Sequence, residues 1–132
     1  TTEQRLDDRD LEFGMFNHRY AGKPYRYAYS AIPEPGWFLF RGLVKHDLDA
    51  RTSEEYEFGP GRFGSEAPFA PKDNWKNEDD GYLVGFLWDD LKQASYVTIF
   101  DAHDITKGPV ARIRMPQRVP NGFHGNWISD TA

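Results

Sequence analysis

Apolar side chains occur along this chain in short runs separated by proline, glycine and acidic residues. The runs are rich in aromatic and β-branched residues, which favour strands over helices. None keeps a 3.6-residue spacing over the length of a helix. The strands predicted from this pattern cover residues 25–32, 37–48, 54–58, 82–88, 96–101 and 110–115. The sequence therefore predicts an all-β chain.

The polar segments between these runs are predicted as turns and loops. Residues 47–52 have the composition of a hairpin turn, and residues 59–80 are predicted as an irregular region. The acidic run Glu78-Asp79-Asp80 is predicted as a solvated turn, because such a run needs no ligand to explain it. Strands spaced about 10–15 residues apart are typical of a meander, as in a propeller blade or part of a sandwich.

Composition narrows the class of protein further. The 132 residues suffice for one domain, and residues 1–10 are predicted as a polar lead-in. Aromatic residues make up 16% of the chain, enough to build a core and to argue against a disordered segment. The net charge of −5, without a basic tract, argues against a nucleic-acid partner.

The absence of cysteine excludes a disulfide framework and a thiolate metal site, and it fits a cytoplasmic location. The longest apolar run, residues 82–88, is too short to span a bilayer. Membrane association of another kind is possible but not indicated by the sequence. The chain begins Thr1-Thr2-Glu3 without an initiator methionine, and we therefore expect a processed, trimmed or partial sequence.

Five motifs follow one another in a specific order. GKPYRYAY at residues 22–29 precedes GSEAPF at residues 64–69, and EDDGYL occupies residues 78–83. GPVARI at residues 108–113 and RVPNGFHG at residues 118–125 complete the series. In this order and spacing the motifs resemble those of the carotenoid cleavage oxygenases, the non-haem iron family with retinal pigment epithelial and lignostilbene-cleaving members.

This resemblance covers the chain from about residue 11 to residue 128. It implies that residues 11–132 are the C-terminal part of a seven-bladed β-propeller, incomplete in this chain, with Fe(II) held on its axis by four histidines. The histidine of the family's closing Phe-His-Gly motif falls on His124, which is therefore the expected iron ligand. The family's other three ligands lie upstream of the matched region.

The resemblance also implies glutamates that orient the ligands, and these match Glu66 and Glu12. Glu66 is the better match, because Gly14-Met15-Phe16 follows Glu12 and Phe13 where the family usually has Pro-Arg-Ile. Neutral imidazoles suit Fe(II), and a carboxylate on the far ring nitrogen fixes the tautomer and raises ligand basicity.

Two further sets of residues have a functional and a structural interpretation. Phe123 either lines the substrate tunnel or belongs to the core, and a core aromatic is the simpler interpretation. His18, His46 and His103 lack any metal-ligand spacing and are predicted as surface histidines.

The resemblance implies that the complete protein uses Fe(II) and O2 to split a conjugated C=C bond into two carbonyl products. Its substrate would be an apolar small molecule: a carotenoid, an apocarotenoid or a stilbene-like compound. We expect the chain alone to be inactive, because upstream sequence or another chain must complete the iron site. The alternative is a non-catalytic β-rich fragment or binding module. A hydrolase with a carboxylate pair is weaker, since no two acidic residues form a recognisable constellation.

Overall fold

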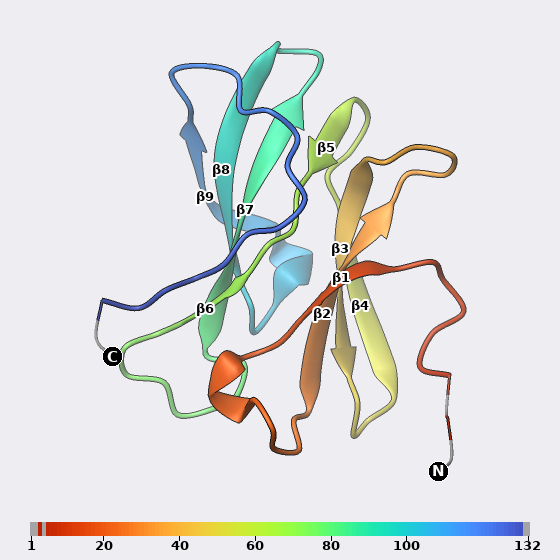
Figure 1. Cartoon of the computed structure of the whole chain (residues 1–132), viewed down its shortest axis with the longest axis vertical. Coiled ribbons are helices and arrows are strands. Elements are labelled where there is room, and N and C mark those ends of the chain that lie inside the picture. Colours follow the sequence, from red (N-terminus) through yellow and green to blue (C-terminus); the bar gives the residue numbers. More distant parts are fainter. Residues whose placement is uncertain (1–2, 4, 131–132) are drawn as a thin grey trace.

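The computed structural model describes residue 3 and residues 5–130, which form an antiparallel β structure (Figure 1). The helical segments within these residues are two 3-10 turns, η1 (His18–Tyr20) and η2 (Ile105–Lys107). The strands are β1 (Glu12–Met15), β2 (Tyr27–Pro33), β3 (Phe40–Asp47), β4 (Thr52–Glu57), β5 (Arg62–Gly64), β6 (Phe69–Pro71), β7 (Gly81–Asp89), β8 (Ala94–Asp101) and β9 (Pro109–Arg114). The six predicted strands correspond to β2, β3, β4, β7, β8 and β9, so the all-β prediction is confirmed.

All strand pairs are antiparallel, and the sheet follows the order β1-β2-β3-β5-β7-β8-β9. Strand β4 pairs with β3, which confirms the predicted hairpin, and β6 pairs with β7. The short strand β5 joins two halves, since Gly64 pairs with Phe40 of β3 and with Leu87 of β7. In Figure 1 the half that contains β2, β3 and β4 lies on the right, and β7, β8 and β9 lie on the left.

The region predicted as irregular, residues 59–80, contains β5 and β6. Each has three residues, too few for an alternating pattern to be visible in the sequence. Their extended conformation depends on β7, with which both pair over their whole length. Pairing with the longer strand β7 therefore fixes the extended conformation of β5 and β6, which their own sequences do not predict.

Aromatic rings from both halves of the sheet meet in one core. Phe100 of β8 contacts Tyr56 of β4 with ring centroids 5.2 Å apart, and Tyr29 of β2 is fully buried. The Tyr29 hydroxyl donates a hydrogen bond to the carbonyl of Ala102 at 3.1 Å, and burial raises the pKa of this phenol. The buried cluster comprises Met15, Tyr29, Leu43, Phe58, Ala67, Phe69, Leu83, Leu87, Phe100, Ala102 and Ile105.

The polar lead-in is attached to the sheet by Arg9. Its guanidinium Nη1 lies 2.6 Å from Glu55 Oε2, and Nη2 donates to Ser53 Oγ at 2.9 Å. The division into residues 1–10 and 11–132 stays a prediction, and residues 1, 2, 4, 131 and 132 of those ranges lie outside the described residues. Within the described part, no helix is long and apolar enough to cross a membrane.

Candidate functional site

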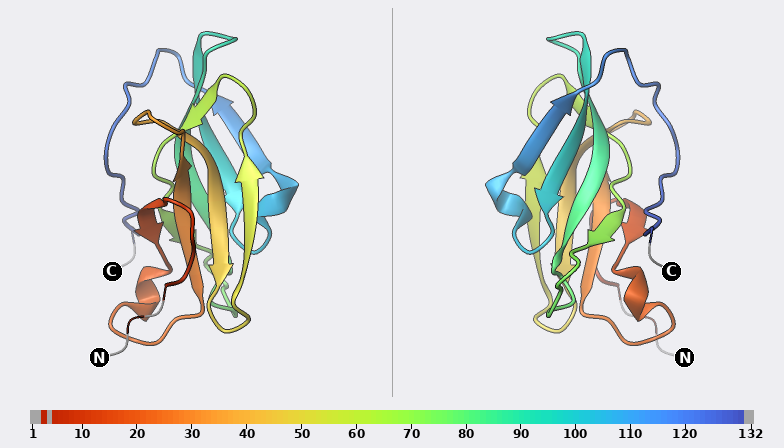
Figure 2. Two further views of the ribbon diagram at one scale, coloured as in Figure 1. Left: turned by 90° about the vertical axis from the view of Figure 1, so that its right-hand side faces the viewer. Right: turned by 90° about the vertical axis from the view of Figure 1, so that its left-hand side faces the viewer.

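A pocket of about 310 Å³ lies between the sheet and the segment that follows β9. This segment leaves the end of the sheet, arcs outward and returns across the face that carries β5 and β6 (Figure 2). Three hydrogen bonds attach it: Met115 N donates to the carbonyl of Ser95 at 2.8 Å, Val119 N donates to Ser95 Oγ at 2.9 Å, and Gly125 N donates to Glu66 Oε2 at 2.6 Å. The wall includes Phe38, Phe40, Trp88 and Phe123, together with Glu66 and His124.

Glu66 and His124 are the polar pair of this pocket. Nδ1 of His124 lies 3.4 Å from Oε2 of Glu66, whose side chain is 14% exposed. The carboxylate reaches both the ring and the backbone just after it, since the same Oε2 accepts the Gly125 N–H. A carboxylate beside Nδ1 favours the tautomer with its proton on that nitrogen, which leaves the lone pair of Nε2 available to a metal.

Phe13 of β1 contacts His124 from another direction. The two ring centroids are 5.4 Å apart with the planes at 76°, and the Phe13 ring also contacts Phe40 at 4.9 Å. Phe13 has a φ of 55°, a left-handed conformation that is rare for a bulky residue. Such a conformation costs about 1–3 kcal/mol. The strained backbone of Phe13 thus occurs where its ring packs on two residues that line the pocket.

The other two predicted site residues, Glu12 and Phe123, differ in where they lie. Glu12 is exposed, and among the described residues its carboxylate has no hydrogen-bond or ion-pair partner. Phe123 is 66% exposed and packs on Phe38, with ring centroids 5.2 Å apart, so it lines the pocket rather than the core. The structure thus brings Glu66, His124 and Phe123 to one pocket and leaves Glu12 facing solvent.

Two of the remaining histidines are exposed, as predicted, and one is not. His18 and His103 are exposed, whereas His46 on β3 is only 4% exposed. Its prediction as a surface histidine is therefore wrong. His46 is buried because its Nε2 lies 2.8 Å from Oδ2 of Asp7, which the lead-in places over β3. Nδ1 of His46 is buried without a partner among the described residues.

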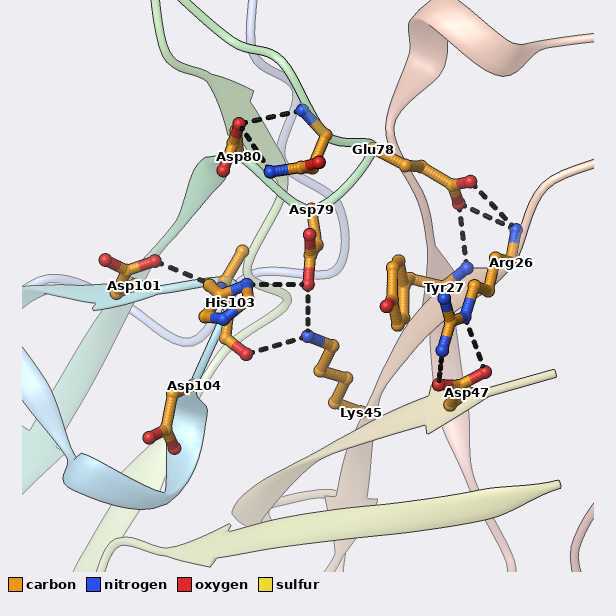
Figure 3. A network of polar contacts seen from close by, with 12 residues as sticks. Arg26, Tyr27, Lys45, Asp47, Glu78, Asp79, Asp80, Asp101, His103 and Asp104 are labelled. Atoms are coloured by element: carbon orange, nitrogen blue, oxygen red, sulfur yellow. Dashed lines mark hydrogen bonds and ion pairs between the residues drawn. The ribbon is translucent and has the colours of Figure 1, made fainter. Parts of the chain in front are cut away.

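The acidic run 78–80 is a turn, but its prediction as a solvated turn is wrong. Asp79 is 3% exposed, and its Oδ2 lies 2.7 Å from Nζ of Lys45 and 3.1 Å from Nδ1 of His103 (Figure 3). Glu78 points the other way, and its carboxylate accepts the backbone N–H groups of Arg26 and Tyr27. Asp79 is buried and Glu78 half-buried, because these carboxylates join the turn to β2, β3 and the segment after β8.

The Lys45 ammonium is fully engaged in this network. Besides Asp79, Nζ donates to the carbonyl of His103 at 2.8 Å and lies 4.3 Å from the centroid of the Tyr27 ring. A small polar hollow of about 200 Å³ lies beside this ammonium, and its lining includes Asp47, which is itself paired with Arg26. The network therefore serves to hold the fold together.

The Asp7 carboxylate makes the free energy of unfolding depend on pH. Hydrogen bonds from the Arg9 guanidinium, then from its backbone N–H and from His46, hold the pKa of Asp7 well below its usual 3.8 against the opposing effect of burial. A depressed folded-state pKa contributes stability that is present above pH 3.8 and is lost as the pH falls through the folded value.

We therefore expect the free energy of unfolding of the unaltered chain to fall below pH 4, and to fall less steeply in Asp7→Asn. Urea denaturation between pH 2 and pH 7 measures this difference. Asp8→Asn is the matched control, because the Asp8 side chain is 94% exposed, and it should keep the slope of the unaltered chain. Equal slopes in Asp7→Asn and the unaltered chain would contradict the assignment.

The residues of the pocket fit one part of a metal centre. The described residues contain no group of three or more His, Cys, Asp or Glu side chains that could hold a metal ion. His124, with Glu66 on Nδ1, has the donor chemistry of a single imidazole ligand for a metal such as Fe(II). Further ligands would have to come from outside these residues.

Comparison with known proteins places this antiparallel β chain in a known class. The chain belongs to the retinal pigment epithelial membrane protein family, whose family model matches residues 1–129. It is 40% identical to the 9-cis-epoxycarotenoid dioxygenase NCED6, chloroplastic, of Arabidopsis thaliana over 92% of this chain and 20% of the relative. It is 36% identical to the zeaxanthin 7,8(7',8')-cleavage dioxygenase, chromoplastic, of Crocus sativus over 95% of this chain and 36% of the relative.

Solved structures agree with these relatives. The lignostilbene dioxygenase of Pseudomonas brassicacearum superposes with a TM-score of 0.86 at 28% identity, covering 95% of this chain and 28% of that one. A variant of Synechocystis apocarotenoid oxygenase gives 0.87 at 30% identity, covering 95% and 26%. The resemblance to carotenoid cleavage oxygenases and the predicted fold class, all-β and part of their propeller, are confirmed. The chain spans about a fifth to a third of the length of these relatives.

Proposed function

We propose that this chain forms part of an Fe(II)-dependent dioxygenase that cleaves a conjugated C=C bond into two carbonyl products, with O2 as co-substrate. One observation carries the proposal: the Glu66 carboxylate lies 3.4 Å from Nδ1 of His124 in a pocket walled by aromatic rings. When bound, Fe(II) supplies the O2 chemistry that side chains lack. His124 is the ligand from this chain, and Glu66 holds its tautomer and orientation.

The walls of the pocket suit an apolar substrate. Phe38, Phe40, Trp88 and Phe123 present ring surface, which favours a conjugated molecule and excludes water. The relatives named above act on carotenoids or carry stilbene or apocarotenoid in their names, so we propose a carotenoid, apocarotenoid or stilbene-like substrate. No nucleic acid is proposed as a partner. The location proposed is cytoplasmic, although the Arabidopsis relative is named chloroplastic.

The 132 residues alone are proposed to be inactive. One imidazole beside the pocket is too few to hold Fe(II) in water, so the remaining ligands must come from additional sequence or another chain. The same observation supports the second candidate function, a β-rich module that binds an apolar molecule without a complete iron site. Iron content separates the two candidates.

The test is a chimera in which this chain replaces the matching segment of the Pseudomonas lignostilbene dioxygenase. We expect the chimera to hold about one iron per protein after anaerobic loading and desalting, and to cleave a stilbene. His124→Ala should lose the iron, and Glu66→Gln should weaken iron affinity about 10–100-fold. Metal analysis and product chromatography measure both effects.

His18→Ala is the matched control, because His18 is exposed on η1 and outside the pocket, and it should leave the iron in place. The isolated chain should bind less than stoichiometric iron under the same loading. Full iron in the His124→Ala chimera would reject His124 as a ligand. Stoichiometric iron in the isolated chain would mean that this chain supplies more ligands than His124.

A further inference from the structure

The imidazole of His124 is held by few contacts. Its side chain is 79% exposed, and its described neighbours are the Glu66 carboxylate at Nδ1 and the ring of Phe13. Glu66 contacts the ring at Nδ1 alone, at one edge. The Phe13 ring, placed nearly perpendicular at 5.4 Å, contacts the imidazole from a second direction and restricts its rotation about χ1 and χ2.

The backbone of β1 departs from regular pairing at Phe13. Glu12 pairs with Ala31 and Met15 with Tyr29, so three steps along β1 correspond to two steps along β2. The extra residue makes a β-bulge, and bulges redirect side chains next to functional sites. In such bulges the left-handed position is usually glycine, but here Phe13 occupies it at a φ of 55°, directly before Gly14.

The bulge is fixed on both sides. Met15 is buried in the core on one side, and on the other side Asp7 is tied to His46 of β3 through the 2.8 Å contact of Oδ2 with Nε2. Between these anchors, the left-handed turn carries the Phe13 ring onto Phe40 and His124. A residue in a disfavoured conformation persists when its surroundings determine it, and here the surroundings are the rings of Phe40 and His124.

We propose that Phe13 is a positioning residue for His124: its ring, aimed by the bulge in β1, holds the imidazole in the orientation in which Nδ1 faces Glu66 and Nε2 faces away. Phe13 acts through His124 and contacts no iron itself. The inference rests on the proposed role of His124 as a ligand, but the orientation of the ring is a property of the iron-free chain and can be measured there.

The test is NMR spectroscopy of the unaltered 132-residue chain with 15N-labelled histidine, without metal. We expect a cross-relaxation contact between the ring protons of Phe13 and His124, and imidazole 15N shifts of a single tautomer with the proton on Nδ1. In Phe13→Leu the contact is lost, and the 15N shifts of His124 move towards the average of the two tautomers. Phe13→Tyr, which keeps the ring, should retain the single tautomer.

Phe123→Leu is the matched control, since Phe123 is adjacent to His124 in sequence while its ring packs on Phe38. It should leave the His124 signals unchanged. Signals of the core residues Tyr29 and Phe100 report whether each variant is folded. Absence of the Phe13–His124 contact in the unaltered chain, or unchanged His124 signals in folded Phe13→Leu, would overturn the proposal.

These outcomes are independent of iron. If the chimera holds no iron at His124 while Phe13→Leu releases the ring, the proposed function fails and the positioning contact stands. If iron binds through His124 and Phe13→Leu leaves the ring in place, the positioning role fails alone. In the iron-loaded chimera, Phe13→Leu should also weaken iron retention while Phe123→Leu does not.

Discussion

Replacing Asp79 by alanine is expected to lower the free energy of unfolding by about 3–5 kcal/mol. The substitution leaves the Lys45 ammonium, whose side chain is 7% exposed, without its carboxylate partner in the interior. The ammonium keeps the carbonyl of His103 and the Tyr27 ring but loses the opposite charge that offsets its lost hydration. Urea denaturation followed by circular dichroism measures the change.

Asp73→Ala is the matched control for Asp79→Ala. Asp73 is an exposed aspartate in the same region of the chain, and removing its carboxylate should change stability by less than about 0.5 kcal/mol. A cost of the same small size in Asp79→Ala would show that the Lys45–Asp79 pair is solvated.

A double substitution separates the ion pair from the packing around it. Lys45→Met with Asp79→Leu leaves no buried charge, so it should cost less than the sum of the two single changes. The carbonyl of His103 loses the Lys45 donor in the double variant, but it lies beside an exposed side chain where water can replace that donor.

Phe100→Ala is expected to cost about 3–5 kcal/mol for a different reason, the cavity that it leaves. Phe100 is 1% exposed and lies against Tyr56 and Phe58, so its removal separates rings that come from the two halves of the sheet. Chemical denaturation of the variant measures the loss.

Phe86→Ala gives the same chemical change on the neighbouring strand. The Phe86 side chain is 44% exposed, so its truncation should cost less than about 1.5 kcal/mol. If both variants lose equal stability, the core does not lie where the structure places it.

The long strands could be predicted from the sequence because their aromatic and β-branched runs are local signals. The predicted run 37–48 began too early, since Trp37 and Phe38 are exposed in the loop before β3. Strand β1 was missed because its four residues, EFGM, show no alternation and take their order from β2. Short segments such as β1 form strands because of the strand with which they pair, and this partner is not visible in the local sequence.

Buried polar groups could not be predicted because their partners are distant in the sequence. Asp79 and Lys45 are 34 residues apart, and His46 and Asp7 are 39 apart. A charged residue that is exposed to solvent and one that is paired in the core can have the same local sequence. Each partner becomes visible only when the strands are assembled.

The residues of the candidate site are predicted by the family motifs and not by the spacing of hydrophobic residues. His124 and Glu66 were chosen by resemblance, and the structure brings them within 3.4 Å. Phe13 was missed as a residue of this site, although Gly14 directly after it is a signal of a bulge in a strand. Its positive φ cannot be deduced from the sequence, because residues other than glycine rarely adopt this conformation.

Phe13 and His124 come from opposite ends of the chain, and the segment that carries His124 can move away from the pocket while the sheet stays folded. The segment that carries His124 is attached by hydrogen bonds to Ser95 and Glu66 and by ring contacts of Arg118 with Trp88, Phe123 with Phe38 and His124 with Phe13. None of these contacts is a strand pair, so breaking them exposes the pocket without separating the sheet. Amide hydrogens of residues 119–125 should therefore exchange with solvent through a local opening of lower free energy than global unfolding. The free energy of opening the pocket is then independent of the free energy of unfolding the sheet.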